Sequence, residues 1–296
     1  MKPIDIIVPY VNNLDPSWVS EFRKYKGCDG LKGTERFRDN GTFKYFFRSI
    51  EKNCPWCRYV FLVVSSESQI PYWLNESHPK LRIVYHKDYI PAEFLPTFNS
   101  NVIELFYSRI EELSDNFVLC NDDMFFLKDL EFFENDKPRL SRKVLFRGLW
   151  TTFSGDTCFV NTVNNNSKLI SKITGMNPFT YCHFHVPMPH NKLVHQYIWY
   201  RFENELLSSI KDSRFRLSKN YTQWLFEDCA KLGNSTSVDT DMYERTHVFT
   251  MSDTSFDLSK YDLICYNDGG NYDKTSVNNF LLSLDKMFVK KSSFEV

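Results

Sequence analysis

The chain has 296 residues, with 36 basic and 37 acidic side chains and a formal net charge of -1 at pH 7. This balance argues against a nucleic-acid binder, which needs a surplus of Lys and Arg to displace counterions from phosphates. Hydrophobic residues make up 42% of the chain, so it can bury a large core, and disorder is excluded as its main state. The length suits one large α/β domain or two smaller ones.

Strands alternate with helices over the first 120 residues. Residues 4–11 form a short apolar run that ends at Asn12, Asn13 and Pro16, as is typical of a buried strand followed by a loop. The further predicted strands are residues 59–65, 81–85 and 117–120, and the predicted helices are residues 42–51 and 101–113. This alternation predicts a parallel sheet with helices on both faces, whose ligands bind at the carboxyl ends of the strands.

The pattern loosens after residue 129. We interpret residues 164–167 as a polar turn and expect the last residues, 290–296, to be frayed. Two more helices are predicted, at residues 195–210 and 221–231. The expected organisation is a single domain over residues 1–296, in which an elaboration of residues 131–296 closes over a core of residues 1–130.

Targeting and redox features point to the cytoplasm. No run of about 18 uncharged apolar residues occurs, so we expect no transmembrane helix. The N-terminal apolar run is also too short for a signal peptide. The eight cysteines have no framework spacing, and we expect them to be reduced and mostly buried. Cys54 and Cys57 match a CxxC pattern, but they follow a helix instead of opening one, which argues against redox chemistry.

Two acidic clusters at the ends of predicted elements are candidates for chemistry. In residues 36–41 (RFRDNG), two arginines and Asp39 form either a solvated helix cap or a phosphate site in which Asp39 holds a reacting hydroxyl. In residues 121–123 (NDD), two adjacent carboxylates repel each other unless a cation lies between them. Hard oxygen ligands suit Mg²⁺ or Mn²⁺, which favours a metal site over a plain turn.

Three further clusters are less specific. His183, His185 and His190 lie within eight residues, and the prolines between them impose extended backbone. No Cys or His pair with metal-finger spacing accompanies them, so an acid or base is favoured over a zinc site, with a structural role as the alternative. Arg214 and Arg216 could be surface residues, and residues 266–270 (YNDGG) could be a turn.

Taken in order, these segments resemble the Stealth family, which includes bacterial capsular polysaccharide phosphotransferases and the catalytic portion of the animal GlcNAc-1-phosphotransferase. Residues 4–16 (IDIIVPYVNNLDP) look like its first block, with Tyr10 where the family has Trp and Asn13 where it has Gly. The strongest block begins with RFRDNGTFKYFFRSIEKNCPW, residues 36–56, and ends at residues 121–123. The later blocks correspond to residues 187–192, 215–216 and 265–269, with Asn220 at a position where the family often has an acid.

The resemblance implies a fold and a reaction. It implies an α/β, glycosyltransferase-A-like (Rossmann-like) fold, with a mostly parallel sheet flanked by helices and a C-terminal helical elaboration. The implied reaction transfers sugar-1-phosphate from a nucleotide-diphosphate sugar, typically a UDP sugar, to an acceptor hydroxyl and releases UMP. The implied partners are the nucleotide sugar and an oligosaccharide or polysaccharide acceptor, free or lipid-linked. No nucleic acid is expected, and association with the inner face of a bacterial membrane would be at most peripheral.

The resemblance also assigns roles to residues. His190 or Asp39 would accept the acceptor proton, Arg216 would neutralise the transferred phosphate, and Asp268 would orient His190 or a metal. Asp122 and Asp123 are the expected ligands of Mg²⁺ or Mn²⁺. The expected substrate contacts are Asn12, Arg36, Arg38, Asn40, Asn99, Ser100, Asn121, Arg214 and Asn267.

Two other functions compete with this one. An ordinary glycosyltransferase would use residues 121–123 as its metal motif, transfer the sugar alone and release UDP. A carbohydrate-binding or scaffold protein would use some of the 27 Phe, 16 Tyr and 6 Trp as stacking surfaces, although aromatic residues in that number more often fill a core.

Overall fold

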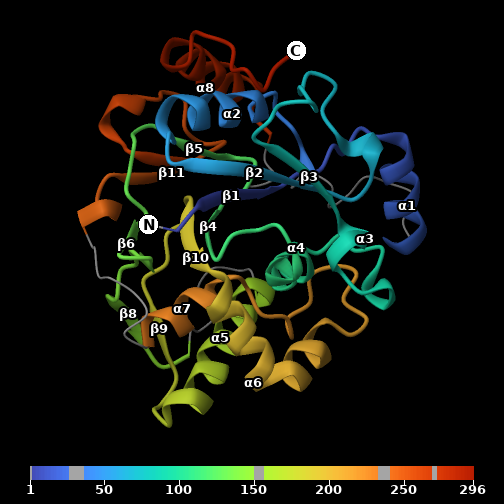
Figure 1. Cartoon of the computed structure of the whole chain (residues 1–296), viewed down its shortest axis with the longest axis vertical. Coiled ribbons are helices and arrows are strands. Elements are labelled where there is room, and N and C mark those ends of the chain that lie inside the picture. Colours follow the sequence, from blue (N-terminus) through green and yellow to red (C-terminus); the bar gives the residue numbers. More distant parts are fainter. Residues whose placement is uncertain (1, 27–36, 150–156, 233–240, 269–271) are drawn as a thin grey trace.

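The centre of the molecule is a five-stranded sheet with the strand order β10-β4-β1-β2-β3 (Figure 1). The computed structural model describes residues 2–26, 37–149, 157–232, 241–268 and 272–296. The strands are β1 (Ile4–Pro9), β2 (Cys57–Val64), β3 (Leu81–Tyr85), β4 (Asn116–Leu119) and β10 (Met188–Asn191). The first four are parallel, whereas β10 runs antiparallel to β4 at one edge. All four predicted strands are therefore confirmed, as is the mostly parallel sheet.

Apolar residues cover both faces of this sheet. In β1, Ile4, Ile6, Ile7 and Val8 are all buried, which explains why the strand is a continuous apolar run and does not alternate. The helix α2 (Phe43–Asn53) lies on one face, whereas α4 (Ser100–Leu105) and α6 (Lys192–Ile210) lie on the other (Figure 1). Two separate apolar clusters fill these two layers.

The predicted helix at residues 101–113 is wrong in its second half. The helix α4 ends at Leu105, and a short 3-10 turn, Tyr107–Arg109, follows it. The Leu105 carbonyl accepts a hydrogen bond of 2.8 Å from the indole nitrogen of Trp199, and the Arg109 N–H bonds to Phe106 instead. The apolar residues remain buried without a continuous helix, so their spacing alone could not reveal the break.

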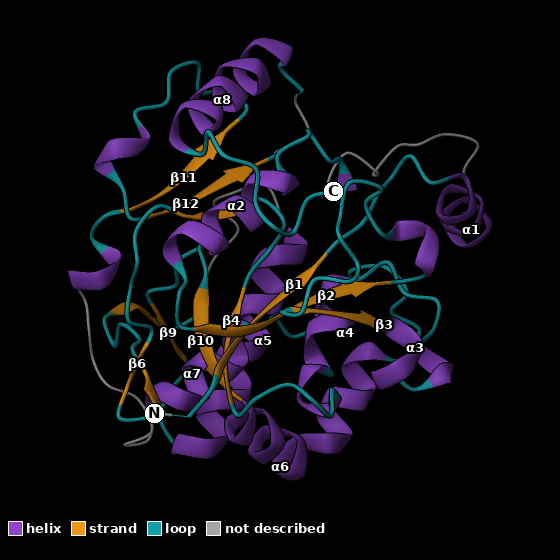
Figure 2. Ribbon diagram, turned by 45° about the horizontal axis from the view of Figure 1, so that its top comes forward, coloured by secondary structure: helices purple, strands orange, loops and turns teal. Residues whose placement is uncertain are grey.

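A second sheet adjoins the first and comes mostly from the C-terminal part of the chain. Its order is β11-β12-β5. The strands are β5 (Met124–Phe126), β11 (Thr246–Thr250) and β12 (Leu263–Asn267), and the helix α8 (Lys274–Met287) lies beside β11 and β12 (Figure 2). Because β5 directly follows residues 121–123, this turn joins the two sheets. The second half of the chain therefore contributes strands as well as the predicted helices.

The remaining elements border the two sheets. Helices α6 and α7 (Trp224–Leu232) confirm the two helices predicted in this half, and α6 is kinked at Phe202. The other helices are α1 (Pro16–Lys26), α3 (His86–Tyr89) and α5 (Thr157–Thr174). Two short ribbons pair β6 (Phe133–Glu134) with β7 (Lys137–Pro138) and β8 (Val144–Arg147) with β9 (Phe179–Tyr181).

Two predictions in the second half are wrong. Residues 164–167 are part of α5, where Asn164, Asn166 and Ser167 are buried and Asn166 donates a 2.7 Å hydrogen bond to Thr222. Residues 290–296 are not frayed, because Phe294 is buried and Glu295 binds Arg48 through two hydrogen bonds of 2.7 Å.

The helices and cysteines of the described residues bear on membrane insertion and on redox chemistry. No helix among the described residues is long and apolar enough to cross a membrane. The seven described cysteines are free. Burial raises the pKa of Cys57 to about 12, which is contrary to the low thiol pKa of a redox centre.

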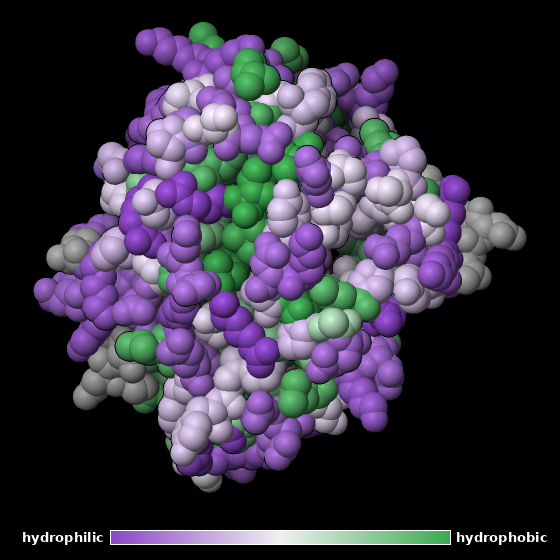
Figure 3. Space-filling model, turned by 45° about the vertical axis from the view of Figure 1, so that its right-hand side comes forward, coloured by the Kyte–Doolittle hydropathy of each residue, from purple (hydrophilic) through white to green (hydrophobic). Residues whose placement is uncertain are grey.

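On the face shown in Figure 3, polar side chains surround a recessed central band of apolar ones.

Candidate active site

A cavity of about 490 Å³ lies where several strands end. Tyr10 follows β1, Asp122 and Asp123 follow β4, and Asp268 follows β12, and all four line the cavity. The carboxyl ends of strands are where open α/β sheets bind ligands, and the volume is that of a small-molecule site. The fold therefore places the cavity where the sequence predicted one.

Most of the predicted site residues meet in this cavity. Asp39, Arg216 and Asp268, which are far apart in the sequence, all line it. The other predicted residues in its wall are Arg38, Asn40, Ser100, Asn121, Asp122, Asp123 and Asn267. Three of the four expected catalytic positions are thus together. Arg36 lies outside the described residues.

His190 is not in the wall of this cavity. It lies on β10 opposite Phe117, on which its ring stacks at 5.6 Å, and the residue is 3% exposed. Its Nδ1 is 3.1 Å from Nε2 of His195, and its Nε2 is 3.7 Å from Glu227. A general base must lie within hydrogen-bond reach of the proton it takes, so we do not retain His190 in that role. His185, from the same predicted cluster, lines the cavity instead.

Asn99 and Arg214 support the cavity from behind and do not line it. Asn99 is buried and donates hydrogen bonds to the carbonyls of Ser213 and Phe215 and to Oδ1 of Asn220. Arg214 donates a 2.7 Å bond to the Pro96 carbonyl. Both residues hold the loop that carries Arg216. We expected them to contact the substrate, but in the structure their role is to position this loop.

Asn12 is also outside the cavity wall. Its backbone N–H donates to Oε1 of Gln69 at 2.6 Å, and its own Oδ1 accepts the N–H of Leu14 at 3.0 Å. It shapes the loop after β1.

Asp39 is held by two hydrogen bonds. Its Oδ2 accepts the Tyr10 hydroxyl at 2.9 Å, and its Oδ1 accepts the Gly41 N–H at 2.7 Å. Gly41 has a φ of +76°, a conformation that glycine adopts without strain. The Tyr10 ring stacks on Phe43 at 4.4 Å. Burial, reinforced by the Asp39 charge, raises the pKa of Tyr10, so its hydroxyl remains a donor that orients the carboxylate. No sequence motif indicates this contact between Tyr10 and Asp39.

Two arginines supply positive charge. Arg38 forms an ion pair of 2.9 Å with Asp268, and its guanidinium lies 4.6 Å from the centre of the Tyr272 ring. Arg216 is exposed and donates a hydrogen bond to the Ser100 hydroxyl. Both guanidinium groups border the cavity, where they can bind phosphate oxygens.

Glu104, which falls within the helix predicted at residues 101–113, also lines the cavity. It is 3% exposed, and burial raises its pKa to about 7, although the Arg216 charge and a hydrogen bond from Ser100 act in the opposite direction. Glu104 lies among buried apolar residues of α4, so the sequence pattern indicated a helix there and did not indicate a cavity residue. Its carboxyl group therefore titrates near neutral pH beside a predicted catalytic arginine.

Carboxyl groups outnumber guanidinium groups in the described part of the wall. They are Asp39, Glu104, Asp122, Asp123 and Asp268, against Arg38 and Arg216. Burial, followed by the charges of Asp123 and Asp39, raises the pKa of Asp122 well above its ordinary value. Burial also raises the pKa of Asp123, with a smaller contribution from Asp268. A nearby cation would relieve this repulsion.

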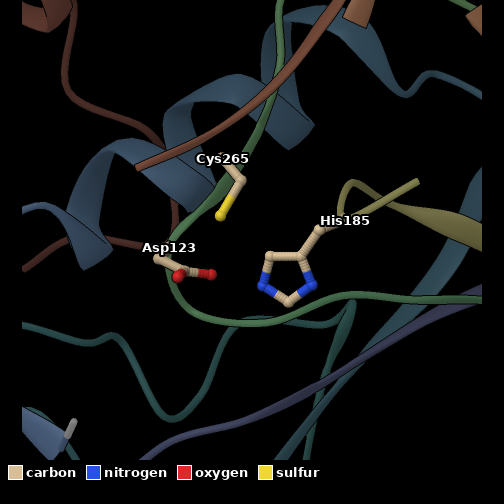
Figure 4. Close-up of side chains that lie close together, drawn as sticks. All are labelled: Asp123, His185 and Cys265. Atoms are coloured by element: carbon tan, nitrogen blue, oxygen red, sulfur yellow. The ribbon is translucent and has the colours of Figure 1, made fainter. Parts of the chain in front are cut away.

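The expected Mg²⁺ or Mn²⁺ ligands were Asp122 and Asp123, but only one of them belongs to a cluster of potential ligands. Asp123 lies with His185 and Cys265, and the ligand atoms of the three are within 4.8 Å of one another (Figure 4). Asp122 is not part of this cluster. Nitrogen and sulfur donors do not fit Mg²⁺, which prefers oxygen ligands.

Comparisons with known proteins identify relatives of the chain. Residues 36–139 match the profile of Stealth protein CR2, conserved region 2. The chain is 34% identical to a capsular polysaccharide phosphotransferase, WcwK, of Streptococcus pneumoniae, over 99% of this chain and 98% of that one. It is 28% identical to a receptor polysaccharide phosphotransferase, WefC, of Streptococcus oralis, over the full length of both.

A solved structure is similar at a lower level. The crystal structure of the galactosyltransferase LgtC, with donor and acceptor sugar analogs, aligns over 98% of both chains at 11% identity with a TM-score of 0.45. Nothing about the activity follows from a likeness of this size.

An α/β fold with a cavity of carboxylates and arginines at its strand ends can accommodate a phosphorylated small molecule. The chain belongs to the Stealth family, as its full-length similarity to the pneumococcal phosphotransferase demonstrates. It is accordingly a sugar phosphotransferase, and the family and the enzyme class predicted from the sequence are confirmed.

Proposed function

We propose that the chain transfers sugar-1-phosphate from a UDP-hexose or UDP-N-acetylhexosamine to a hydroxyl of an acceptor glycan, forms a phosphodiester and releases UMP. The observation that carries this proposal is the convergence of Asp39, Arg216 and Asp268 on one cavity. The names of the relatives, which refer to capsular and receptor polysaccharides, support a polysaccharide acceptor, free or lipid-linked. Such acceptors are consistent with a cytoplasmic enzyme at the inner face of a bacterial membrane.

Asp39 is the proposed general base. An acceptor hydroxyl bound near it would lose its proton to the carboxylate as its oxygen attacks the phosphorus that carries the sugar. Because each carboxylate oxygen has two lone pairs, Asp39 can accept this proton while Tyr10 and Gly41 still donate to it. The bond from this phosphorus to the bridging oxygen breaks, and the oxygen leaves with UMP.

Arg216 and Arg38 are the proposed partners of the phosphates. Arg216 would neutralise the oxygens of the transferred phosphate as charge builds up, which is the main demand of phosphoryl transfer on a protein. Arg38, oriented by Asp268, would bind the phosphate that leaves with the nucleotide. Asp268 thus acts through Arg38 as a positioning residue.

Aromatic side chains form another part of the wall and suit the base and sugar of the donor. Trp18, Phe37 and Phe98 pack edge to face, with ring centres 5.2 to 5.6 Å apart for the pairs that include Trp18, and all three line the cavity. Aromatic faces bind sugars and nucleobases by stacking. We propose that the uridine or the sugar lies against this wall.

The released nucleotide tests the proposal. Purified protein is incubated with an acceptor polysaccharide and each of several UDP-hexoses and UDP-N-acetylhexosamines, and the nucleotides are separated by chromatography. UMP formed only when acceptor is present supports the proposal, with Asp39→Asn as the inactive control. UDP in place of UMP would mean that the sugar alone moves, as in a conventional glycosyltransferase, and would overturn it.

A further inference from the structure

We infer that Asp123, His185 and Cys265 form a binding site for one divalent transition-metal ion of the Zn²⁺ or Co²⁺ kind, open on its fourth side to the substrate cavity. One ligand comes from the turn after β4, one from the loop before β10 and one from β12. Figure 4 shows the three side chains turned toward a common centre.

The distances suit tetrahedral coordination. The three ligand atoms lie within 4.8 Å of one another. Around zinc, nitrogen and oxygen ligands at about 2.0–2.1 Å and a thiolate at about 2.3 Å would be roughly 3.3–3.6 Å apart. The three ligand atoms would therefore have to approach one another by about 1.5 Å at most when the ion binds.

A second observation points to a cation. Oδ1 of Asp123 is inaccessible to solvent and has no hydrogen-bond partner among the described residues. Leaving a buried carboxylate oxygen without a donor is costly. The contact that the structure offers Asp123 is the Cys265 thiol, a weak donor. A metal ion would satisfy the oxygen fully.

The backbone fixes two of the ligands relative to each other. Cys265 pairs with Met124 across β12 and β5, and the Tyr266 N–H donates to the Asp123 carbonyl at 2.8 Å. These backbone hydrogen bonds therefore hold Asp123 and Cys265 at a fixed separation. Rigid elements that hold ligands in place are what a metal site requires.

The third ligand lies on a loop that is also anchored. Two residues before His185, the ring of His183 lies 3.4 Å from Glu227 and 3.1 Å from Asp228, and stacks on Trp224 at 4.6 Å. These contacts tie the loop to α7. His185 itself is only half-buried and lines the cavity together with Asp123.

The donor set determines the class of ion. One carboxylate, one imidazole and one thiolate are the ligands of zinc and its neighbours, not of Mg²⁺. Three protein ligands leave a coordination position free, as in catalytic sites, and here that position faces the cavity. Resting on the proposed function, we assign this position to a phosphate oxygen of the donor, whose negative charge the carboxylates would otherwise repel.

Binding consumes no oxidant and releases one proton. The thiol S–H bond of Cys265 breaks, its proton goes to solvent, and sulfur bonds to the metal.

Cobalt titration tests the site without any sugar nucleotide. Chelator-treated full-length protein is titrated with Co²⁺, and the thiolate-to-cobalt absorption in the near ultraviolet is recorded. We expect a band that saturates at one equivalent, resists excess Mg²⁺ and disappears on adding Zn²⁺. The band should be lost in Cys265→Ser and in His185→Ala. It should persist in Cys120→Ser, the matched control, because Cys120 is equally buried but outside the cluster.

The inference is overturned if folded wild-type protein gives no thiolate band or if the band survives in Cys265→Ser. Circular dichroism establishes folding of each variant. If Cys265→Ser does not fold, His185→Ala provides the test, because His185 is only half-buried and its replacement disturbs the core less. The thiolate-to-cobalt band must then be lost in His185→Ala. Because the titration contains no donor sugar, its failure leaves the UMP assay unaffected, and failure of that assay leaves the metal site standing.

Discussion

Glu104 gives the sharpest prediction on stability because its pKa is displaced within the accessible pH range. In the folded protein burial raises that pKa from an ordinary value of 4.5 to about 7. Between these two values the folded state binds more protons than the unfolded state, so the free energy of unfolding falls as pH rises from about 4.5 to 7. Each pKa unit is worth about 1.4 kcal/mol, which makes the total loss about 3 kcal/mol.

The variant Glu104→Gln should remove this loss. Its amide has nearly the same shape and no charge at any of these pH values. The free energy of unfolding of the variant minus that of the wild type should therefore rise by about 3 kcal/mol between pH 4.5 and pH 8. Subtracting the two proteins cancels other groups, such as His86, whose pKa burial lowers to about 4.

Urea unfolding at a series of pH values, followed by circular dichroism, measures this difference. Glu134→Gln, which replaces an exposed carboxyl, serves as the control for the substitution itself. A difference for Glu104→Gln that does not vary with pH would mean that the Glu104 carboxyl is ionised at its ordinary pKa in the folded state. The description of a buried acid beside Arg216 would then be refuted.

Three other substitutions test the site and the fold. Asp39→Asn should abolish transfer and leave the Kd for the UDP sugar nearly unchanged, and an equal loss of binding would make Asp39 structural. Arg216→Lys should lower kcat by about tenfold for each 1.4 kcal/mol of lost transition-state contact, and normal turnover would remove Arg216 from the mechanism. Glu295→Gln should cost roughly 3 kcal/mol by leaving Arg48 buried without its partner, whereas Glu205→Gln, in an exposed pair, should cost less than about 1 kcal/mol in the same denaturation assay.

Strands β1, β2 and β4 could be predicted because burial on both faces makes most of each a continuous apolar run. Elements whose limits depend on distant side chains could not. The end of α4 is set by Trp199, which takes the Leu105 carbonyl, and the middle of α5 is polar because Thr222 pairs with Asn166. The C-terminal segment is ordered by Arg48, which lies far away in the sequence.

The same distinction applies to the site. Asp122 and Asp123, directly after the strand predicted at residues 117–120, could be placed at the cavity from the topology. Asp268 follows β12, a strand that was not predicted, and only the family resemblance assigned it to the site. Which histidine of three would face it depends on the path of the loop before β10, and the sequence favoured His190 over His185. The cluster of Asp123, His185 and Cys265 has no motif spacing, because three separate segments contribute one ligand each.

The fate of the phosphate that carries the sugar tests the central claim most directly. A UDP sugar labelled with ³²P in that phosphate is incubated with enzyme and acceptor polysaccharide, and the polymer is separated from the nucleotides. We predict that the label enters the polymer in a phosphodiester and that the released UMP is unlabelled. Label recovered in UDP, with none in the polymer, would contradict attack at phosphorus.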